Sequence, residues 1–154
     1  MKKQLIVPSL LVACLGASLA VAGENWIGTW KLNAAKSQPG ANALRAETLK
    51  FEATPAGIKL SLEGADPQGK PVQAGYTSKF DGTAVPWTGN PMADTAAPKK
   101  IDDNSYENTS KLGGKGTVTA KVVVSKDGKT LTVTQDGTGP NGEKIHSVGV
   151  YDKQ

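Results

Sequence analysis

One histidine and a few carboxylates are the residues of this chain that could carry acid–base chemistry. His146 is the only histidine, so a nucleophilic triad or a zinc site built on imidazole would have to include it. In a strand with Ile145 and Tyr151 on its inner face, His146 points outward. The chain also lacks a Gly-x-Ser-x-Gly motif. We therefore predict a surface histidine without a catalytic role.

The acidic residues are densest around Asp102 and Asp103. Paired carboxylates can hydrolyse glycosides or bind calcium. Here the pair precedes Asn104, a composition typical of turns in which aspartate accepts backbone N–H groups. The segment 136–143 is similar to a calcium loop in composition, but its spacing does not fit the EF-hand pattern. We interpret both segments as turns and expect no metal site and no cofactor.

The aromatic residues offer binding chemistry instead. Trp87 stands between Pro86 and Pro91 in a segment that we interpret as a loop. A tryptophan in a loop either covers the core or contacts a partner, and if the interior holds a cavity we place Trp87 at its entrance. Tyr76 and Tyr151 fall in the inward phase of their strands, where each hydroxyl needs a hydrogen-bond partner from the protein or from a ligand.

Alternating apolar and polar residues, the pattern of half-buried strands, recur along the chain. The segments with this pattern are residues 26–32, 49–53, 58–62, 72–80, 118–124, 131–133 and 145–151. Turn residues separate them, and the clearest is Asp127-Gly128, a hairpin signal between two β-rich runs. We predict about eight to ten short strands joined by tight turns as an antiparallel meander.

A meander leaves two edge strands, and closure into a barrel removes them. We therefore predict an all-β fold, an antiparallel up-and-down β-barrel. A two-sheet β-sandwich is the alternative, and the uniformly short turns without a long Greek-key return favour the barrel. No stretch has helical periodicity, although residues 34–43 could hold one helical turn, which Pro39 and Gly40 interrupt.

The N-terminal segment has the layout of a secretory signal. Lys2 and Lys3 precede an apolar run that ends in Ala20-Val21-Ala22, an A-x-A cleavage site. We predict a signal peptide over residues 1–22 and one β-barrel domain over residues 23–154, located in the periplasm or secreted. The run is too short and too rich in small residues for a good membrane span.

A second interpretation of this segment stays open. Leu11-Val12-Ala13-Cys14 resembles a bacterial lipobox, in which Cys14 would carry a lipid and tether the domain to a membrane. Cleavage after Ala22 would instead remove the only cysteine and leave a domain without thiol chemistry.

The charge of the domain points away from nucleic acid. Removal of Lys2 and Lys3 lowers the formal net charge from +4 to +2. Arg45 is the only arginine, whereas proteins that read phosphates and bases rely on arginine. We expect no nucleic-acid partner, no transmembrane segment in the mature chain, and a monomer.

The strings at the two ends of the domain carry a resemblance. Gly28-Thr29-Trp30-Lys31-Leu32 and Val150-Tyr151-Asp152-Lys153 resemble the first and last strands of the calycin superfamily, the lipocalins and fatty-acid-binding proteins. The chain is also similar to small exported bacterial proteins without a known activity. The calycin resemblance implies a barrel in which Trp30 plugs one end and the interior takes a small apolar ligand.

The chain departs from that superfamily at several positions. Only residues 34–43 stand where fatty-acid-binding proteins have a helical lid. Their Arg-x-Tyr clamp for a carboxylate corresponds here to Gly149 and Tyr151, so the arginine is absent. Lipocalins cover the tryptophan with an arginine near the C-terminus, and no arginine follows Arg45.

These observations predict an exported, non-enzymatic module that binds a small apolar or amphipathic molecule. The residues expected to line or cap the site are Trp30, Phe51, Tyr76, Phe80, Trp87 and Tyr151. An envelope interaction protein with a packed barrel is the alternative, and a hydrolase or isomerase on the same scaffold is a third hypothesis.

Overall fold

The computed structural model describes residues 24–154, so the predicted signal peptide and Cys14 lie outside the described residues. Short strands account for most of this part of the chain. In order they are β1 (Gly28–Leu32), β2 (Arg45–Thr54), β3 (Gly57–Ala65), β4 (Pro71–Ser78), β5 (Val85–Pro86), β6 (Thr95–Asp102), β7 (Ser105–Leu112), β8 (Lys115–Val124), β9 (Thr130–Thr138) and β10 (Lys144–Lys153). A 3₁₀ turn, η1 (Ala34–Lys36), follows β1.

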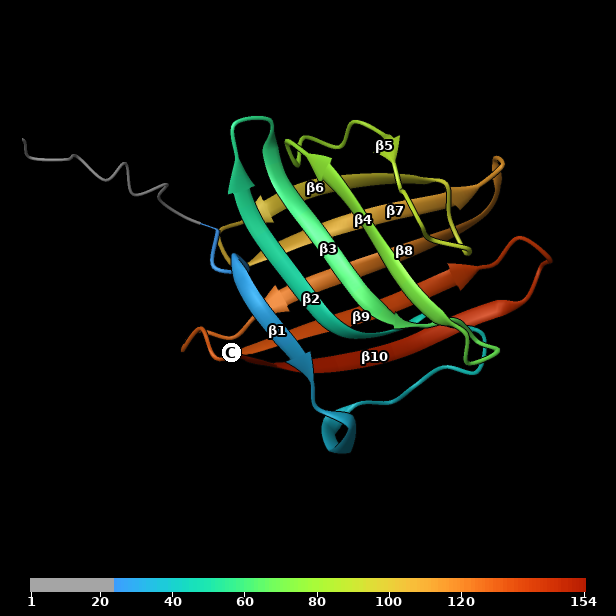
Figure 1. Ribbon diagram of the computed structural model, residues 1–154, viewed down its shortest axis with the longest axis horizontal. Coiled ribbons are helices and arrows are strands. Elements are labelled where there is room, and N and C mark those ends of the chain that lie inside the picture. Colours follow the sequence, from blue (N-terminus) through green and yellow to red (C-terminus); the bar gives the residue numbers. More distant parts are fainter. Residues whose placement is uncertain (1–23) are drawn as a thin grey trace, which may run out of the picture.

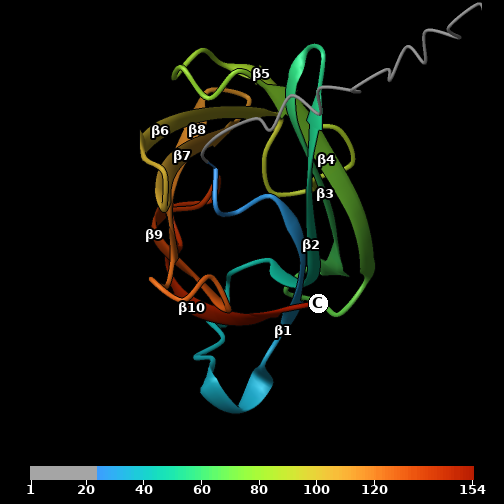
Figure 2. The same ribbon diagram turned by 90° about the vertical axis from the view of Figure 1, so that its left-hand side faces the viewer.

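The ten strands form one antiparallel sheet in the order β4-β3-β2-β1-β10-β9-β8-β7-β6-β5. All neighbours in this order are consecutive in the chain except β1 and β10, which pair the two ends of the domain (Figure 1). The sheet curls round on itself, so that β4 approaches the segment that contains β5 (Figure 2).

Backbone contacts close the seam between β4 and the segment after β5. Gly75 and Thr88 exchange two hydrogen bonds of 3.0 Å each. Gly89 permits this approach, because its φ is +76° and a Cβ there would lie 2.2 Å from the Gln73 carbonyl oxygen. The predicted up-and-down barrel is confirmed, and the alternative of two packed sheets is wrong, because one continuous sheet closes on itself.

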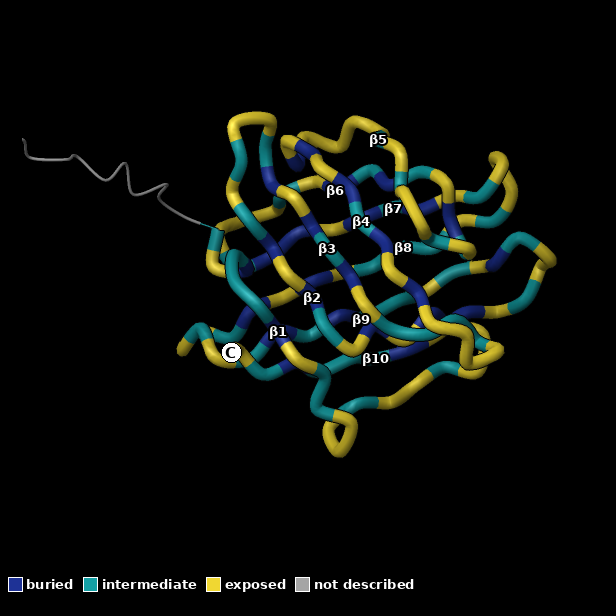
Figure 3. Tube along the Cα trace, in the orientation of Figure 1, coloured by how far each residue is buried: buried dark blue, intermediate teal, exposed yellow. Residues whose placement is uncertain are grey.

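Buried and exposed residues alternate along most strands (Figure 3). In β4, for example, Val72, Ala74, Tyr76 and Ser78 are buried, and the residues between them are exposed or half-buried. The inward rows predicted from the sequence follow this pattern, because successive side chains of a strand point to opposite faces of the sheet and every second one points inward.

β6 and β7 were not predicted as strands. The inner face of β7 carries Tyr106, Asn108 and Ser110, which are all buried but do not form an apolar row. Pro98 interrupts the pattern of β6, yet the strand tolerates it. The Pro98 carbonyl accepts the Gly82 N–H at 2.9 Å, so this side of Pro98 faces the loop that contains Gly82. The N–H that proline lacks would point to the same side, and no hydrogen bond to β7 is lost.

The acidic segments are turns, as predicted. An Asp102 carboxylate oxygen accepts the Asn104 backbone N–H at 2.8 Å, and this bond lowers the pKa of Asp102. Asp127 accepts the Lys129 N–H at 3.0 Å in the Asp-Gly hairpin between β8 and β9. The calcium-like segment connects the paired strands β9 and β10, whose register begins at Thr138 and Lys144.

Aromatic side chains fill one end of the barrel, which we call the aromatic end. Its members are Trp26, Phe51, Tyr76, Phe80 and Tyr106. Phe80 and Tyr106 meet edge to face with ring centroids 4.8 Å apart, and Trp26 and Tyr106 lie 5.2 Å apart. Such pairs contribute about 0.5–1.5 kcal/mol each beyond the area that they bury.

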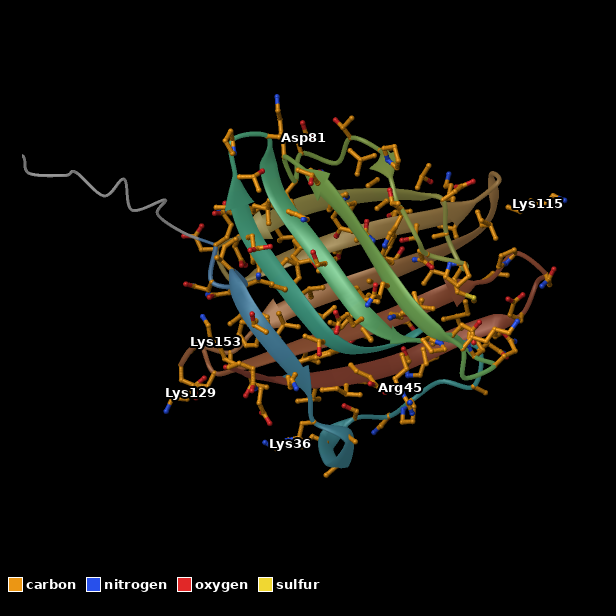
Figure 4. All side chains as sticks on the ribbon, viewed as in Figure 1. Lys36, Arg45, Asp81, Lys115, Lys129 and Lys153 are labelled. Carbon is orange, nitrogen blue, oxygen red and sulfur yellow. The ribbon has the colours of Figure 1, made fainter. Side chains whose placement is uncertain are left out.

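Trp30 is fully buried next to the aromatic end and is held on both sides. Its indole N–H donates to the Trp26 carbonyl at 2.8 Å, and the Lys153 ammonium lies 5.2 Å from its ring centroid. Lys153, labelled in Figure 4, comes from the last strand. A lysine from the last strand therefore lies over this tryptophan.

Candidate functional site

The shortness of β1 opens the barrel wall on one side. β1 pairs with β2 only through Gly28–Lys31 and with β10 only through Trp30–Leu32. Beyond Leu32 the first residues of β2 and of β10 face each other without a strand between them. The segment 33–44, which we call the strap, leaves the sheet here and lies outside the opening (Figures 1 and 2).

Hydrogen bonds attach the strap to β10. Gln38 and Val148 exchange backbone bonds of 2.7 and 2.9 Å, and the Ser37 hydroxyl accepts the Val150 N–H at 2.9 Å. Gly40 lies against the β10 backbone, where a Cβ would come within 2.1 Å of the His146 carbonyl oxygen. The exposed edge of β10 is therefore satisfied by the strap rather than by β1.

A β-bulge bends the start of β2 on the other side of the opening. The register with β3 shifts between Ala46 and Thr48, so Glu47 is an extra residue that faces solvent while Ala46 stays buried. Gly64 of β3 accommodates the bulge, because a Cβ there would lie 2.0 Å from the Arg45 carbonyl oxygen. The bulge orients Ala46 toward the interior beneath the strap.

Tyr151 spans the opening from inside the barrel. Its hydroxyl donates to the Ala46 carbonyl at 2.9 Å and so links β10 to the bulged part of β2. Gly149 makes room for the ring, because a Cβ at this position would lie 2.8 Å from a Tyr151 ring carbon. Burial raises the pKa of Tyr151, which keeps the phenol neutral and able to donate.

The opening forms a pocket of about 450 Å³, which we call the outer pocket. Its lining comes from the strap, β1, β2, β9 and β10. The apolar members include Leu32, Ala43, Leu44, Ala46, Val133, Val148 and Tyr151, and the polar members are Lys31, Ser37, Arg45, Glu47, Thr48, Gln135 and Ser147. Figure 4 labels Arg45, where the strap joins β2.

The charges of the outer pocket lie at its rim. Arg45 pairs with Glu47 at 3.1 Å, and their side chains are 56% and 58% exposed. Glu47 is the only carboxylate in the lining, and no histidine lines it. The pocket thus offers an apolar wall, a few hydroxyl and amide groups, a solvated ion pair and the exposed ammonium of Lys31, a set that suits binding better than proton transfer.

A smaller cavity of about 70 Å³, which we call the inner cavity, lies inside the barrel beneath the loop 87–93. Its lining residues are Leu44, Leu62, Trp87, Asn90, Met92, Ala93, Ser110, Val118, Ala120, Gln135 and Ile145. Leu44 and Gln135 line the outer pocket as well, so the two spaces adjoin at these side chains.

The structure separates the six predicted site residues into two groups. Trp30, Phe51, Tyr76 and Phe80 are buried at or beside the aromatic end and line neither the outer pocket nor the inner cavity. Tyr151 lines the outer pocket, and Trp87 lines the inner cavity. Whether any of the six binds a ligand remains a prediction.

Several residues of the site were not singled out from the sequence. The strap carries no strand or helix pattern, so Ser37 and Leu44 were not recognised as pocket residues. Gln135 falls one step beyond the predicted row 131–133 and continues its inward phase. The period-two pattern, extended by one residue pair, would have identified Gln135.

His146 lies outside this site. It is on the outer face, 65% exposed, with Nδ1 2.6 Å from an Asp136 carboxylate oxygen, which confirms the predicted outward position. Within residues 24–154 no three His, Cys, Asp or Glu side chains gather in a way that could hold a metal ion. No helix in this part of the chain has the length and apolar character to cross a membrane.

Together these features define an all-β, up-and-down barrel protein with a pocket in its wall. Protein-family models give no match to the chain, and neither do the curated proteins. Among solved structures, a de novo designed fluorescence-activating β-barrel is similar at 12% sequence identity, with a TM-score of 0.46. The alignment covers 84% of this chain and 94% of the designed one.

Proposed function

We propose that this protein is an exported binding module for a small apolar or amphipathic molecule, and not an enzyme. The outer pocket carries the proposal. Its volume of about 450 Å³ falls within the range of about 300–1,000 Å³ that ligand pockets occupy. Its combination of apolar walls with a few hydroxyl and amide groups is the lining expected for an amphipathic ligand.

The alternative is an envelope interaction protein that acts through its surface and has a packed interior. The aromatic end fits that description, since its rings are in mutual contact. The opposite part of the barrel does not fit it, because its inward residues include small ones such as Ala46, Ser147 and Gly149, which leave the outer pocket unfilled. The pocket therefore favours the binding module.

Binding can be tested with protein purified from its own host. Native mass spectrometry followed by solvent extraction should reveal a co-purifying molecule, and the neutral fluorescent probe N-phenyl-1-naphthylamine should bind and brighten. Ser147→Trp places a large ring in the outer pocket, because Ser147 is buried on the inner face of β10 and lines this pocket, and it should reduce binding of either molecule by tenfold or more. Val123→Trp is the matched control, because Val123 is 39% exposed and lines neither space.

The binding proposal would be abandoned if no molecule co-purified and the probe bound equally to both variants. Cross-linking in the host envelope that captured a partner protein on the barrel surface, together with an empty pocket, would support the interaction protein instead.

A further inference from the structure

A tryptophan that lines the inner cavity has a hydrogen-bond donor without a partner. Trp87 lines this cavity, and its indole N–H is buried with no hydrogen-bond partner among residues 24–154. Burial without a partner is unfavourable for an N–H group, which donates strongly to any acceptor placed near it. The indole N–H of Trp30, in contrast, donates to the Trp26 carbonyl at 2.8 Å. The indole N–H of Trp26 is also buried without a partner among the described residues, but Trp26 lines neither the inner cavity nor the outer pocket.

The position of Trp87 is set by contacts around it. Its backbone N–H donates to the Asp94 carbonyl at 2.8 Å, and the neighbouring Thr88 pairs with Gly75 across the seam. Its ring meets Tyr76 edge to face with centroids 5.1 Å apart. The unpartnered N–H therefore belongs to a side chain held between the seam and the aromatic end.

A second unpartnered polar atom lies beside the same lining. Ser110 lines the inner cavity and accepts a hydrogen bond of 3.0 Å from the side-chain amide of Asn108. The other end of that amide, the Asn108 Oδ1 atom, is buried without a partner among the described residues. Asn108 itself is 2% exposed. The interior here is thus polar as well as small.

The inner cavity excludes charged groups. All its lining side chains are apolar or neutral, with Ser110, Gln135 and Asn90 as the polar members besides Trp87. An ionised group placed here would lose its hydration without meeting an opposite charge, which is costly. A neutral oxygen atom would lose less hydration free energy on burial and would accept a hydrogen bond from the Trp87 indole N–H.

We propose that the inner cavity is a recognition subsite for a small uncharged oxygen-bearing group, a carbonyl or hydroxyl, at one end of the ligand. This inference rests on the proposed binding function. The group accepts a hydrogen bond from the Trp87 indole N–H, and the apolar body of the ligand lies in the outer pocket. Leu44 and Gln135, which line both spaces, contact the ligand where it passes between them.

The sizes of the two spaces agree with this arrangement. The inner cavity, at about 70 Å³, holds roughly two water volumes, which is enough for a carbonyl and its methyl group and too little for a ring system. The outer pocket, at about 450 Å³, takes the remainder of the molecule.

Three probes of matched length test the subsite: methyl hexyl ketone, the alkene in which C=CH₂ replaces its C=O, and the octanoate anion. In ¹⁵N-correlated spectra the chain gives three indole signals, one from each tryptophan. The ketone should move the Trp87 indole proton downfield and leave the signals of Trp26 and Trp30 unchanged. The alkene should bind without that shift, and octanoate should bind at least tenfold more weakly than the ketone.

Trp87→Phe keeps an aromatic ring against Tyr76 and removes the N–H. It should weaken the ketone about fivefold, the loss of one neutral hydrogen bond, and leave the alkene unchanged. Met92→Leu, which alters the same lining without a polar change, is the matched control. If Trp87→Phe does not fold, triple-resonance assignment of the unaltered protein identifies the Trp87 signal, and the three probes decide the question.

The outcomes separate this inference from the proposed function. If the probes shift amide signals of Val148 and Leu44 but the ketone leaves the Trp87 indole unmoved, the outer pocket binds and the subsite is refuted, with water as the partner of the indole. If octanoate binds as well as the ketone, the neutral subsite is also wrong. If no probe shifts any signal, the binding function and the subsite both fall.

Discussion

At the scale of single residues, Gly149 and Tyr151 act as a unit. Their side chains share the inner face of β10, and the Tyr151 ring lies over the position where a Gly149 side chain would stand. Glycine usually weakens a strand, because it loses more backbone conformational entropy on folding than other residues and packs no side chain. Here the ring covers the glycine and delivers the Tyr151 hydroxyl to the Ala46 carbonyl.

We therefore predict that Gly149→Ala destabilises the protein by about 1–3 kcal/mol, the usual cost of overpacking a filled site. In a Tyr151→Leu background the same change should cost nothing or stabilise slightly, because alanine suits a strand better than glycine. Urea unfolding followed by circular dichroism measures the double-mutant cycle. Equal costs in the two backgrounds would show that the ring is not the reason for the glycine.

The three tyrosines of the chain are all buried. Burial raises the pKa of Tyr76, and hydrogen bonding with Tyr106 opposes part of that rise. Burial also raises the pKa of Tyr106, and interaction with Tyr76 adds to the rise. The neutral phenols therefore stabilise the folded state below pH ~10, the ordinary tyrosine pKa, and this contribution declines as the pH rises beyond it.

An alkaline titration should show this coupling. We expect little tyrosinate absorbance in the folded protein near pH ~10, followed at higher pH by ionisation that coincides with loss of the far-ultraviolet dichroism. Titration in urea, where the chain is unfolded, is the control, and there the three tyrosines should ionise near the ordinary tyrosine pKa of about 10. Gradual ionisation near pH ~10 without unfolding would contradict the burial of the three hydroxyls.

At the scale of elements, the strap takes the place of the missing half of β1. β10 is twice as long as β1, with ten residues against five, so its first half needs another partner. The strap supplies hydrogen bonds to Val148 and Val150 but presents irregular backbone, which leaves the outer pocket behind it. A segment without regular ladders opens more easily than a strand.

Gly40→Val should lift the strap from β10. The new Cβ would meet the His146 carbonyl oxygen, a backbone atom that cannot rotate away. We expect faster hydrogen exchange at the Val148 N–H, which donates to the Gln38 carbonyl at 2.9 Å, with the rest of the barrel unchanged.

The neighbouring Ala41→Val is the control for this change. It introduces the same side chain into the strap at a residue that is exposed. Similar exchange rates at Val148 in both variants would mean that the close approach of Gly40 does not hold the strap in place.

At the scale of the whole molecule, the barrel has two unlike parts. The aromatic end is packed with rings, and the Lys100 ammonium lies 5.9 Å from the Trp26 ring centroid while pairing with Glu24 at 3.1 Å and Asp103 at 2.8 Å. The opposite part has small and polar inward residues, and both the outer pocket and the inner cavity lie there. The Trp87 ring, 5.1 Å from that of Tyr76, connects the packed aromatic end to the inner cavity.

The prediction that the protein is exported belongs to this scale as well. We expect the protein isolated from its host to begin at Gly23, because the A-x-A site ends at Ala22. Intact mass measurement checks this, and an Ala20→Leu variant with a damaged cleavage site should retain the leader. A lipid-modified chain beginning at Cys14 would show instead that the barrel is tethered to a membrane.

The sequence by itself determined the strands with apolar inner faces and the turns between them. Rows such as Ile58 to Leu62 and the Asp127-Gly128 turn depend on local period and local backbone preference, which are legible in a few adjacent residues. β7 was not predicted, because the polar residues Asn108 and Ser110 face inward and interrupt the apolar row. Their mutual hydrogen bond offsets part of the cost of burying these polar side chains.

The site was decided by the tertiary structure. The outer pocket exists because β1 ends at Leu32 while β2 and β10 continue, and β2 and β10 lie at opposite ends of the domain sequence. The inner cavity depends on where the seam sets Trp87. Local patterns specify which face of a strand is buried, but the space between faces depends on register and closure, which involve residues distant in the chain.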